Sequence, residues 1–358
     1  MNEEAPFKGF ESLSELGEFG LIDQIAGLFG KGCVEDTIGI GDDCAVLPYK
    51  DGQSLLITTD MLIEDRHFRH SWISAEDLGY KSLAVNLSDI SAMGGKPLYA
   101  FLSIGLPDDL TLDWVERFFR GTRELSETNG VKLLGGDTTK SPGPMVINYT
   151  VLGVMDEDSV LWRSSAKPGD QIAVLGKLGE SGAGLKLLIE NKSSYSSSEQ
   201  AMIKSHSRPQ LYVEESQFLA SNSAVHAMID LSDGIQSDAG HIAKKSGVTL
   251  QVDADRIPIT SDLKQVCESY NWDSLELALS SGEDYGLLFT FDEANAGRLS
   301  DEFKQKFNIE LTIIGEVKDG SPELTLLKDG DAFDIGKKGF DHFRSEKLER
   351  SDSSDPSG

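Results

Sequence analysis

The chain has 358 residues, enough for two domains of ordinary size, and 39% of its residues are hydrophobic, which suffices for sizeable cores. Its 60 acidic and 33 basic residues give a formal net charge of -27, which disfavours binding to nucleic acid and to anionic membrane surfaces. The same field repels a phosphorylated ligand unless bound cations reverse the local sign, and its simplest interpretation is a highly soluble surface.

The cysteines and the N-terminus indicate a cellular compartment. The three cysteines are odd in number and none lies at metal-ligand spacing from another, so neither a disulfide framework nor a zinc site is predicted. This pattern fits a reducing cytoplasm. The N-terminus is acidic where a signal peptide would be basic, and no apolar run approaches the roughly 20 residues of a membrane span. We therefore expect a cytoplasmic protein.

The first half of the chain predicts strands and two helices. Strands are expected at 54–59, 98–106, 131–134 and 145–154, and a helix at about 111–125. Another helix begins after Ser74, in a segment that resembles a capping box with Asp77 in place of the usual Glu, and ends near residue 93 before a glycine pair.

This earlier helix carries two stripes at the helical period. Leu83, Leu87 and Ile90 form an apolar stripe. Ser82, Asn86 and Asp89 form a second stripe, displaced by about 100°. One face is thus expected to pack and a neighbouring face to present a carboxylate.

The second half begins after a turn at 167–170. Strands are expected at 171–175, 224–231, 248–252, 285–291 and 311–317, with a Gly-rich loop and a helix at 176–189. The Ser-rich stretch 191–198 is predicted to be a mobile insertion. We predict a mixed α/β (α+β) chain of two sandwiches rather than one doubly wound sheet, with domains at 1–157 and 158–346 and a disordered tail at 347–358.

Aspartates recur next to Gly, Ser and Thr at the ends of the expected strands. The segments are GIGDD at 39–43, TTD at 58–60, NLSD at 86–89, GGDTT at 135–139 and DLSDG at 230–234. Magnesium prefers carboxylate, hydroxyl and phosphate oxygens, and glycine lets the backbone approach a phosphate closely. Turns and helix caps use the same residues and explain any one segment equally well. Five such segments together favour a metal and phosphate site.

Familiar phosphate motifs are absent from the sequence. The loop at 176–184 precedes a helix and could bind an anion, but it lacks the order of a Walker loop, and a tight turn is its simplest interpretation. The glycines at 39–41 lack the third glycine of a dinucleotide fingerprint, and no protein-kinase catalytic loop is present. Taken in isolation, His67 is expected to be a surface histidine.

A set of ordered motifs resembles the thiamine-monophosphate kinase family. They are GIGDDCAVL (39–47), TTDMLIEDRHF (58–68), YKSLAVNLSDISAMGGKPLYAFLSIGLP (80–107), LLGGDTTK (133–140), RSSAKPGD (163–170), IDLSDGIQSDAGHI (229–242), SGEDYGLLFT (281–290) and KGFDHF (338–343). The resemblance spans almost the whole chain before the tail. It implies the two-domain fold of the aminoimidazole ribonucleotide synthetase superfamily, in which the N-terminal sheet pairs across a homodimer and ATP lies in a cleft near that interface.

The resemblance also implies roles for individual residues. The magnesium positions are Asp43, Thr58, Thr59, Asp60, Asp89, Asp137, Asp230 and Asp233. The ATP contacts are Gly136, Asp137, Arg163 and Ser232, and the contacts to thiamine monophosphate are His67, Glu283 and Phe340. The aromatic residue that often precedes the GGD strand is replaced here by Thr128-Asn129.

The implied reaction transfers the γ-phosphate of ATP to thiamine monophosphate, giving thiamine diphosphate and ADP, with several Mg²⁺ ions and no catalytic protein nucleophile or base. Two alternatives stay open. One is another enzyme of the same superfamily, although residues 1–32 lack the reactive cysteine that a selenophosphate synthetase would need. The other is a non-catalytic nucleotide-binding regulator, which would have no need of several metal ligands.

Overall fold

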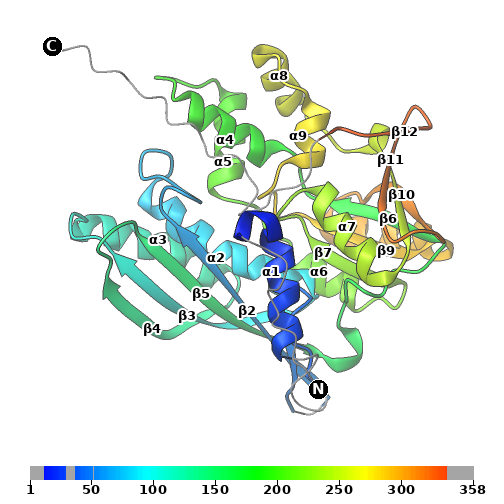
Figure 1. Cartoon of the computed structure of the whole chain (residues 1–358), viewed down its shortest axis with the longest axis horizontal. Helices are drawn as coiled ribbons and strands as arrows, with labels where there is room; N and C mark the ends of the chain where they lie inside the picture. Colours follow the sequence, from blue (N-terminus) through cyan, green and yellow to red (C-terminus); the bar gives the residue numbers. More distant parts are fainter. Residues whose placement is uncertain (1–11, 30–36, 51, 337–358) are drawn as a thin grey trace.

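The computed structural model describes residues 12–29, 37–50 and 52–336 of the chain (Figure 1). These residues form two halves, each built on its own sheet. Phe340 and the predicted tail at 347–358 lie outside the described residues. Within the described ranges, no helix combines the length and the apolar character that a bilayer span requires.

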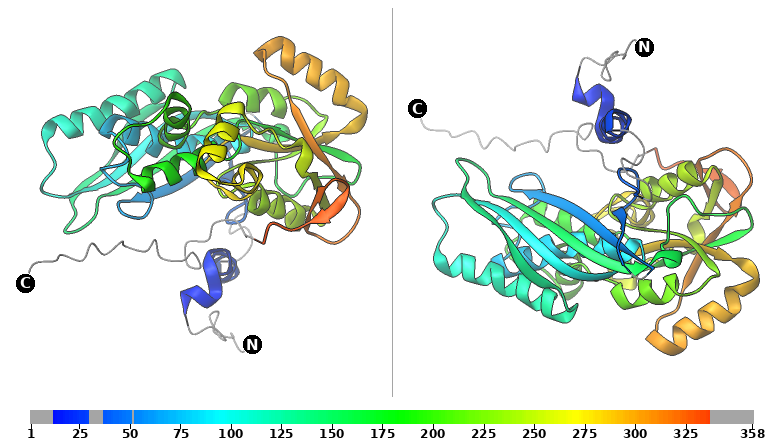
Figure 2. Two further views of the ribbon diagram at one scale, coloured as in Figure 1. Left: turned by 90° about the horizontal axis from the view of Figure 1, so that it is seen from above. Right: turned by 90° about the horizontal axis from the view of Figure 1, so that it is seen from below.

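The N-terminal half is a five-stranded sheet in the order β1-β2-β5-β3-β4. Its strands are β1 (Ala45–Pro48), β2 (Gln53–Ile63), β3 (Lys96–Leu106), β4 (Lys132–Lys140) and β5 (Val146–Asp156), and its helices are α2 (Ala75–Ala92) and α3 (Leu112–Thr128). All neighbouring pairs are antiparallel except β3 and β4. Figure 2 shows α2 and α3 on one side of the sheet and the long strands in front when the molecule is seen from below. One face of the sheet is therefore left open.

Helix α2 is the central element of the molecule. It begins as predicted, because the Ser74 hydroxyl accepts a hydrogen bond from the Asp77 backbone N–H at 3.1 Å. Both predicted stripes are buried: Leu83 and Asn86 are each 0% exposed. The polar stripe is buried because α2 packs on the N-terminal sheet with one side and contacts β7 and α6 of the C-terminal half with another.

The C-terminal half is a seven-stranded sheet in the order β12-β11-β8-β10-β6-β9-β7. Its strands are β6 (Asp170–Leu175), β7 (Val225–Asp230), β8 (Thr249–Asp253), β9 (Leu287–Asp292), β10 (Thr312–Lys318), β11 (Leu324–Lys328) and β12 (Asp331–Phe333). Its helices are α4 (Glu180–Glu190), α5 (Ser197–Ser207), α6 (Val213–Ala220), α7 (Ile235–Ser246), α8 (Ser261–Tyr270), α9 (Ser274–Ser280) and α10 (Ala296–Phe307). Helix α7 shares a core with one face of this sheet, and α6 and α10 share a core with the other.

A further helix, α1 (Leu13–Phe29), precedes both sheets. It lies across the junction between the two halves and stands apart from the body of the molecule (Figures 1 and 2). Its Phe19 ring lies 4.5 Å from the ring of His241, between ring centres, and this contact ties α1 to α7.

Two predicted strand ends were wrong, and the Ser-rich stretch at 191–198 leads into a helix. Ser196 and Glu199 form a reciprocal capping box that starts α5. Residues 135–140 were expected beyond a strand end but belong to β4, which runs to Lys140. Residues 58–60 lie inside β2, which continues to Ile63, because β5 pairs with it along its whole length.

Candidate functional site

An acidic cluster lies where the two halves meet. Among the described residues, Asp43, Asp89 and Asp230 each present a carboxylate oxygen, and these oxygens all lie within 4.8 Å of one another. Asp43 precedes β1, Asp89 lies in the last turns of α2, and Asp230 ends β7. The fold therefore brings together three of the aspartate segments that are far apart in the sequence.

Neighbouring hydroxyl and amide groups hold these carboxylates. The Thr58 hydroxyl donates to Asp89, and the Ser88 hydroxyl donates to Asp230 at 2.6 Å. The backbone N–H of Asp60 donates to the Asn86 side-chain carbonyl at 3.0 Å. The two turns of α2 that contain Asn86, Ser88 and Asp89 thus fix the cluster from one side.

The carboxylates of the cluster repel one another, and their burial disfavours the charged forms. Burial, with the carboxylate of Asp43 nearby, raises the pKa of Asp60 to about 6 and that of Asp230 to about 8. Burial, with Asp60 and Asp230 beside it, also raises the pKa of Asp89 well above its usual range. Carboxylates held this close in a buried site are the donor set that a hard divalent cation fits.

Arg163 supplies a protein cation to the cluster. Its Nε lies 3.0 Å from one Asp43 carboxylate oxygen, and its Nη2 donates to the other. Its backbone N–H donates to Asp42 at 3.2 Å. Burial, together with the carboxylate of Asp43, raises the pKa of Asp42 to about 7. Arg163 is therefore engaged by the acidic residues and does not stand open to a phosphate.

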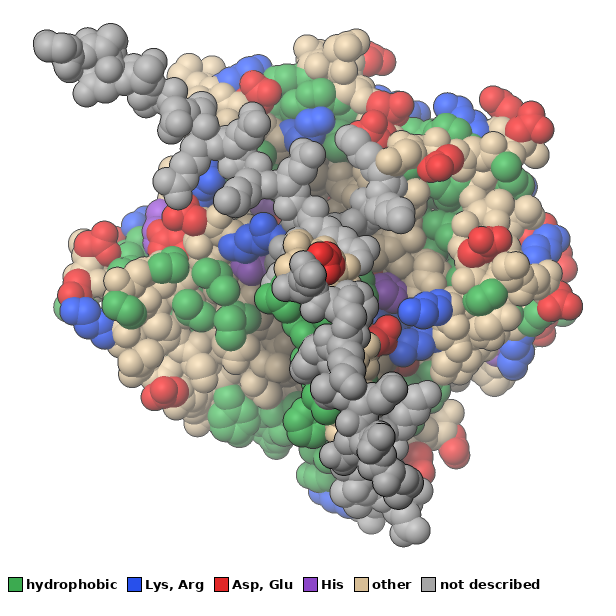
Figure 3. Space-filling model, viewed as in Figure 1, with side chains coloured by type: hydrophobic (Ala, Val, Ile, Leu, Met, Phe, Trp, Pro, Cys, Tyr) green, Lys and Arg blue, Asp and Glu red, His purple; other side chains and the backbone are tan. Residues whose placement is uncertain are grey.

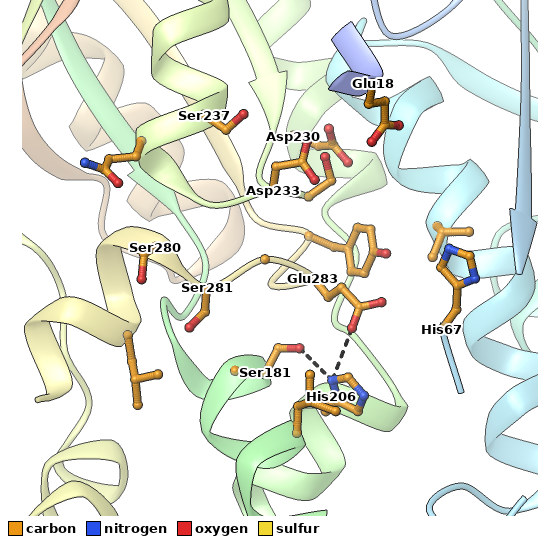
Figure 4. Close-up of a pocket in the computed structure, with 18 of the residues that line it drawn as sticks. Glu18, His67, Ser181, His206, Asp230, Asp233, Ser237, Ser280, Ser281 and Glu283 are labelled. Atoms are coloured by element: carbon orange, nitrogen blue, oxygen red, sulfur yellow. Dashed lines mark hydrogen bonds and ion pairs between the residues drawn. The ribbon is translucent and has the colours of Figure 1, made fainter. Parts of the chain in front are cut away.

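A cleft of about 1380 Å³ extends from this cluster between the two halves. Asp60, Asp89 and Asp230 line it, together with Ser232 and Asp233. Figure 4 shows Asp230 and Asp233 on one side of the cleft, with Glu18 of α1 near them and Glu283 and His67 further along. The cleft thus joins the acidic cluster to the residues that the resemblance assigns to the second substrate.

The loop that carries Glu283 is pinned against the segment after β7. The Glu283 N–H donates to the Ser232 carbonyl at 2.7 Å, and the Tyr285 N–H donates to the Leu231 carbonyl at 2.9 Å. Glu283 and Tyr285 both have positive φ, 63° and 50°, which costs free energy in a non-glycine residue. At Gly282 a Cβ would lie 2.4 Å from the Ser232 carbonyl oxygen, so only glycine fits there.

His67 and the Gly-rich loop have defined partners. The Nδ1 of His67 accepts the Ile63 backbone N–H at 2.9 Å, and the ring lines the cleft. Two N–H groups at the start of α4, those of Gly179 and Ser181, donate to the carboxylate of Asp284 at 2.6 and 3.1 Å. The anion position at this helix N-terminus is therefore filled by the protein's own side chain.

The structure places Asp137 away from the cluster. Register pairs Asp60 with Tyr149, Tyr149 with Leu102, and Leu102 with Gly136. Three strand spacings of about 4.8 Å separate the Asp60 and Gly136 backbones, or about 14 Å in all. Asp137 pairs with Ser103, whose side chain is exposed, and so lies on the open face of the sheet, whereas Asp60 lies on the helix-covered face.

The predicted site residues thus fall into three groups. The cluster or its cleft contains Asp43, Thr58, Asp60, Asp89, Arg163, Asp230, Ser232, Asp233, His67 and Glu283. The exposed parts of the N-terminal sheet contain Thr59, Gly136 and Asp137. Phe340 lies outside the described residues. Sequence reasoning assigned no role to Asp42, Ser88 or Lys81. Asp42 and Ser88 adjoin predicted residues, and Lys81 lies in the motif at 80–107.

Comparisons with known proteins agree with this arrangement. Residues 41–155 match the family model described as AIR synthase related protein, N-terminal domain, and residues 167–326 match the C-terminal domain of the same description. The thiamine-monophosphate kinase of Aquifex aeolicus is 37% identical over 92% of this chain and 99% of its own length. The thiamine-monophosphate kinase of Escherichia coli K12 is 38% identical over 91% of this chain and 98% of its own length.

The chain belongs to the thiamine-monophosphate kinase family. A solved structure of AaThiL complexed with AMPPCP and TMP superposes with a TM-score of 0.80 at 35% identity, covering 94% of this chain and all of that one. The predicted family and the predicted two-domain α/β fold are confirmed.

Proposed function

We propose that the chain transfers the γ-phosphate of ATP to thiamine monophosphate and releases thiamine diphosphate and ADP. The observation that carries this proposal is the single cleft that joins the carboxylates of Asp60, Asp89 and Asp230 to His67 and Glu283. One end of the cleft suits cations and phosphates, and the other presents a carboxylate to a cationic ring. The named activity of the relatives, described above, supports the same reaction.

The acidic cluster is proposed to hold Mg²⁺ through Asp43, Asp60, Asp89 and Asp230, with Thr58 and Asp233 beside them. Its oxygen donors and the raised pKa values of its carboxylates fit such an ion. When bound, Mg²⁺ would neutralise phosphate charge at this end of the cleft. The protein's own part is to hold the carboxylates close together through Ser88 and Thr58, so that the ligands are in place before substrate arrives.

The two substrates are proposed to enter from opposite ends of the cleft. Arg163 and Ser232 serve the ATP side, and Arg163 offers forked donors once its pair with Asp43 opens. Gly136, which adjoins Asp137 on β4, is proposed to serve the ATP site of the partner chain. His67 donates to the substrate phosphate, and the Glu283 carboxylate favours the cationic or amino groups of thiamine. Phe340 is proposed to stack on a thiamine ring.

Transfer is proposed to be direct, without a phosphoenzyme. The acceptor is itself a phosphate whose terminal oxygens are largely anionic at neutral pH, since its second pKa is about 6. Such a nucleophile needs no general base, unlike the hydroxyl acceptor of a protein kinase. With γ-labelled ATP and no acceptor, the denatured protein should carry no label. Stoichiometric label that chases into thiamine diphosphate would contradict direct transfer.

We also propose that the chain works as a homodimer in which the open faces of two N-terminal sheets meet. Met61, Tyr99 and Phe101 lie on that face and are 50%, 39% and 39% exposed. In Figure 3, hydrophobic side chains gather at the lower left, where Figure 1 places this sheet. Asp137 lies on the same face, three strands from Asp60 of its own chain, so Asp137 is proposed to serve the site of the partner chain.

The deciding experiment is incubation of the purified protein with ATP, Mg²⁺ and thiamine monophosphate, with the products read by mass. Thiamine diphosphate and ADP are expected in equal amounts. Turnover of aminoimidazole precursors without turnover of thiamine monophosphate would favour another enzyme of the superfamily. Binding of nucleotide without any turnover would favour a regulator.

A further inference from the structure

A lysine of the N-terminal half is buried beneath the substrate end of the cleft. The side chain of Lys81, on α2, is 1% exposed. Its Nζ lies 3.2 Å from Oε2 of Glu283 and 3.4 Å from Nε2 of His206, which is on α5. Among the described residues that line the cleft, Glu283 and His206 are present and Lys81 is not. Lys81 therefore reaches the cleft only through these two side chains.

The chemistry of the contacts fixes the protonation of His206. Burial, together with the charge of Lys81, lowers its pKa to about 4, so the ring is neutral at neutral pH. An ammonium group only donates hydrogen bonds, so Nε2, which faces Lys81, must accept. The ring proton then resides on Nδ1, which lies 3.3 Å from Oε2 of Glu283 and 3.1 Å from the Ser181 hydroxyl (Figure 4).

Glu283 is consequently held as an anion in one orientation. Burial on its own would raise the pKa of this carboxyl, but the Lys81 ammonium brings it below its usual value. The other ionisable groups beside it are Asp284 and Tyr285 of the same loop. Lys81 and His206 both contact Oε2, so Oε1 is used by neither of them.

We propose that Lys81 is a positioning residue that, through neutral His206 and directly, fixes the charge and the orientation of Glu283 toward the thiamine moiety. This inference rests on the proposed function, because it takes Glu283 as a contact to the substrate. It makes a helix of the N-terminal half responsible for substrate recognition by a loop of the C-terminal half. Lys81 itself does not touch the substrate.

The test is a cycle of three variants: Lys81→Met, Glu283→Gln and the double variant. Charged hydrogen bonds of this kind correspond to about ten- to hundredfold in affinity. Lys81→Met is therefore expected to raise the KM for thiamine monophosphate by about that factor, with kcat and the KM for ATP much less affected. The double variant is expected to resemble Glu283→Gln alone, because Lys81 acts through Glu283.

The double variant also guards against misfolding, since it removes both buried charges and leaves neither uncompensated. Lys304→Met is the matched control: it breaks an exposed pair with Glu310, and its KM for thiamine monophosphate should equal that of the wild type. Titration calorimetry of thiamine monophosphate with AMPPCP present gives the same comparison without turnover.

Three outcomes would overturn the inference. Effects of Lys81→Met and Glu283→Gln that multiply in the double variant would mean that Lys81 acts independently of Glu283. An equal loss for both substrates in Lys81→Met would indicate a general structural role. An unchanged KM in Lys81→Met would show that Glu283 needs no positioning. Each of these differs from failure of the proposed function, in which the wild-type protein does not turn over thiamine monophosphate at all.

Discussion

Arg163 holds both carboxylate oxygens of Asp43, and the pair is nearly buried: the side chains are 18% and 0% exposed. Removing one partner of such a pair costs about 3–5 kcal/mol, because a buried charge is left without a cation. We expect Arg163→Met to lower the melting temperature of metal-free protein strongly and that of Mg²⁺-saturated protein much less. Thermal unfolding with and without Mg²⁺ measures this difference.

Arg208 provides the control for this measurement. It pairs with Asp77 and Glu124 away from the acidic cluster. The loss of stability in Arg208→Met should therefore be the same with and without Mg²⁺. If Arg163→Met is destabilised equally with and without Mg²⁺, Asp43 is not a ligand of the metal.

The proposed metal ligands predict a loss of turnover without a loss of fold. Asp60→Asn and Asp137→Asn should each lower kcat by about a hundredfold or more, since each removes a charged ligand worth several kcal/mol to the transition state. Circular dichroism should remain that of the wild type. The exposed Asp109→Asn is the matched control and should keep full activity. Near-normal turnover of both variants at limiting Mg²⁺ would show that Asp60 and Asp137 are not metal ligands and have a structural role.

A mixture of the two inactive variants tests whether Asp137 serves the partner chain. A heterodimer of Asp60→Asn and Asp137→Asn contains one site with both aspartates intact if the site takes Asp137 from the other chain. Co-refolding the two variants should then restore a substantial part of the activity. A mixture as inactive as its components would place Asp60 and Asp137 in separate roles or in one chain.

The exposed ring of Phe101 offers a test of the proposed homodimer. Replacing this exposed ring by a charge on the open face, in Phe101→Asp, should convert the proposed dimer to a monomer of low activity, because charge is costly in the centre of an interface. Light scattering at micromolar concentration measures the mass. Leu112→Asp changes an 88% exposed leucine on α3 instead and should leave the mass unchanged. A wild-type protein that is monomeric and fully active would contradict the proposed homodimer.

Two adjacent glycines of β4 are expected to differ in how strongly the same substitution destabilises the fold. At Gly136, φ is +148° and a Cβ would lie 1.7 Å from the Leu102 carbonyl oxygen. At Gly135 the nearest atom to a Cβ is an aromatic carbon of Phe101 at 3.8 Å, an ordinary contact. Gly136→Ala should therefore lower the free energy of unfolding by several kcal/mol, and Gly135→Ala by less than about 1 kcal/mol. Denaturant titration distinguishes them, and equal effects would contradict the β4 register.

The neutral ring of His206 is expected to account for part of the loss of folding stability at acid pH. Its pKa is lowered to about 4 in the folded protein and is about 6.5 when unfolded, so the unfolded chain binds the extra proton first. The stability that His206 contributes is present above pH 6.5 and is lost as the pH falls toward 4, by about 1.4 kcal/mol per pH unit. In His206→Gln the free energy of unfolding should fall less steeply between pH 6.5 and 4. Parallel profiles for the two proteins would mean that His206 titrates normally.

Local patterns in the sequence predicted the elements whose signals are local. The cap at Ser74 and the two stripes placed α2 correctly, because capping and helical period act within a few residues. Helix α5 has an equally local signal, the Ser196 and Glu199 capping box, which the serine-rich composition obscured. The extent of β2 was underestimated because its length is fixed by pairing with β5, about ninety residues later.

The site could be predicted only as a set of motifs. Their order identified the family, and the aspartate segments named most of the cluster. The contact between Lys81 and Glu283 spans 202 positions in the chain and has no sequence signature. The position of Asp137 on the open face depends on strand order, which motif spacing does not encode. Long-range packing therefore carries the information that the sequence patterns lack.

Helix α2 supports the proposed site at two points: Lys81 contacts Glu283 at the proposed thiamine end, and Asp89 lies in the acidic cluster at the proposed phosphate end. Eight residues of α-helix separate the two, a rise of about 12 Å. In the proposed reaction, this rise along one helix contributes to the distance between ring recognition and phosphate transfer. We therefore expect an acceptor with a longer or shorter link between its ring and its phosphate to bind less tightly, even when its functional groups are the same.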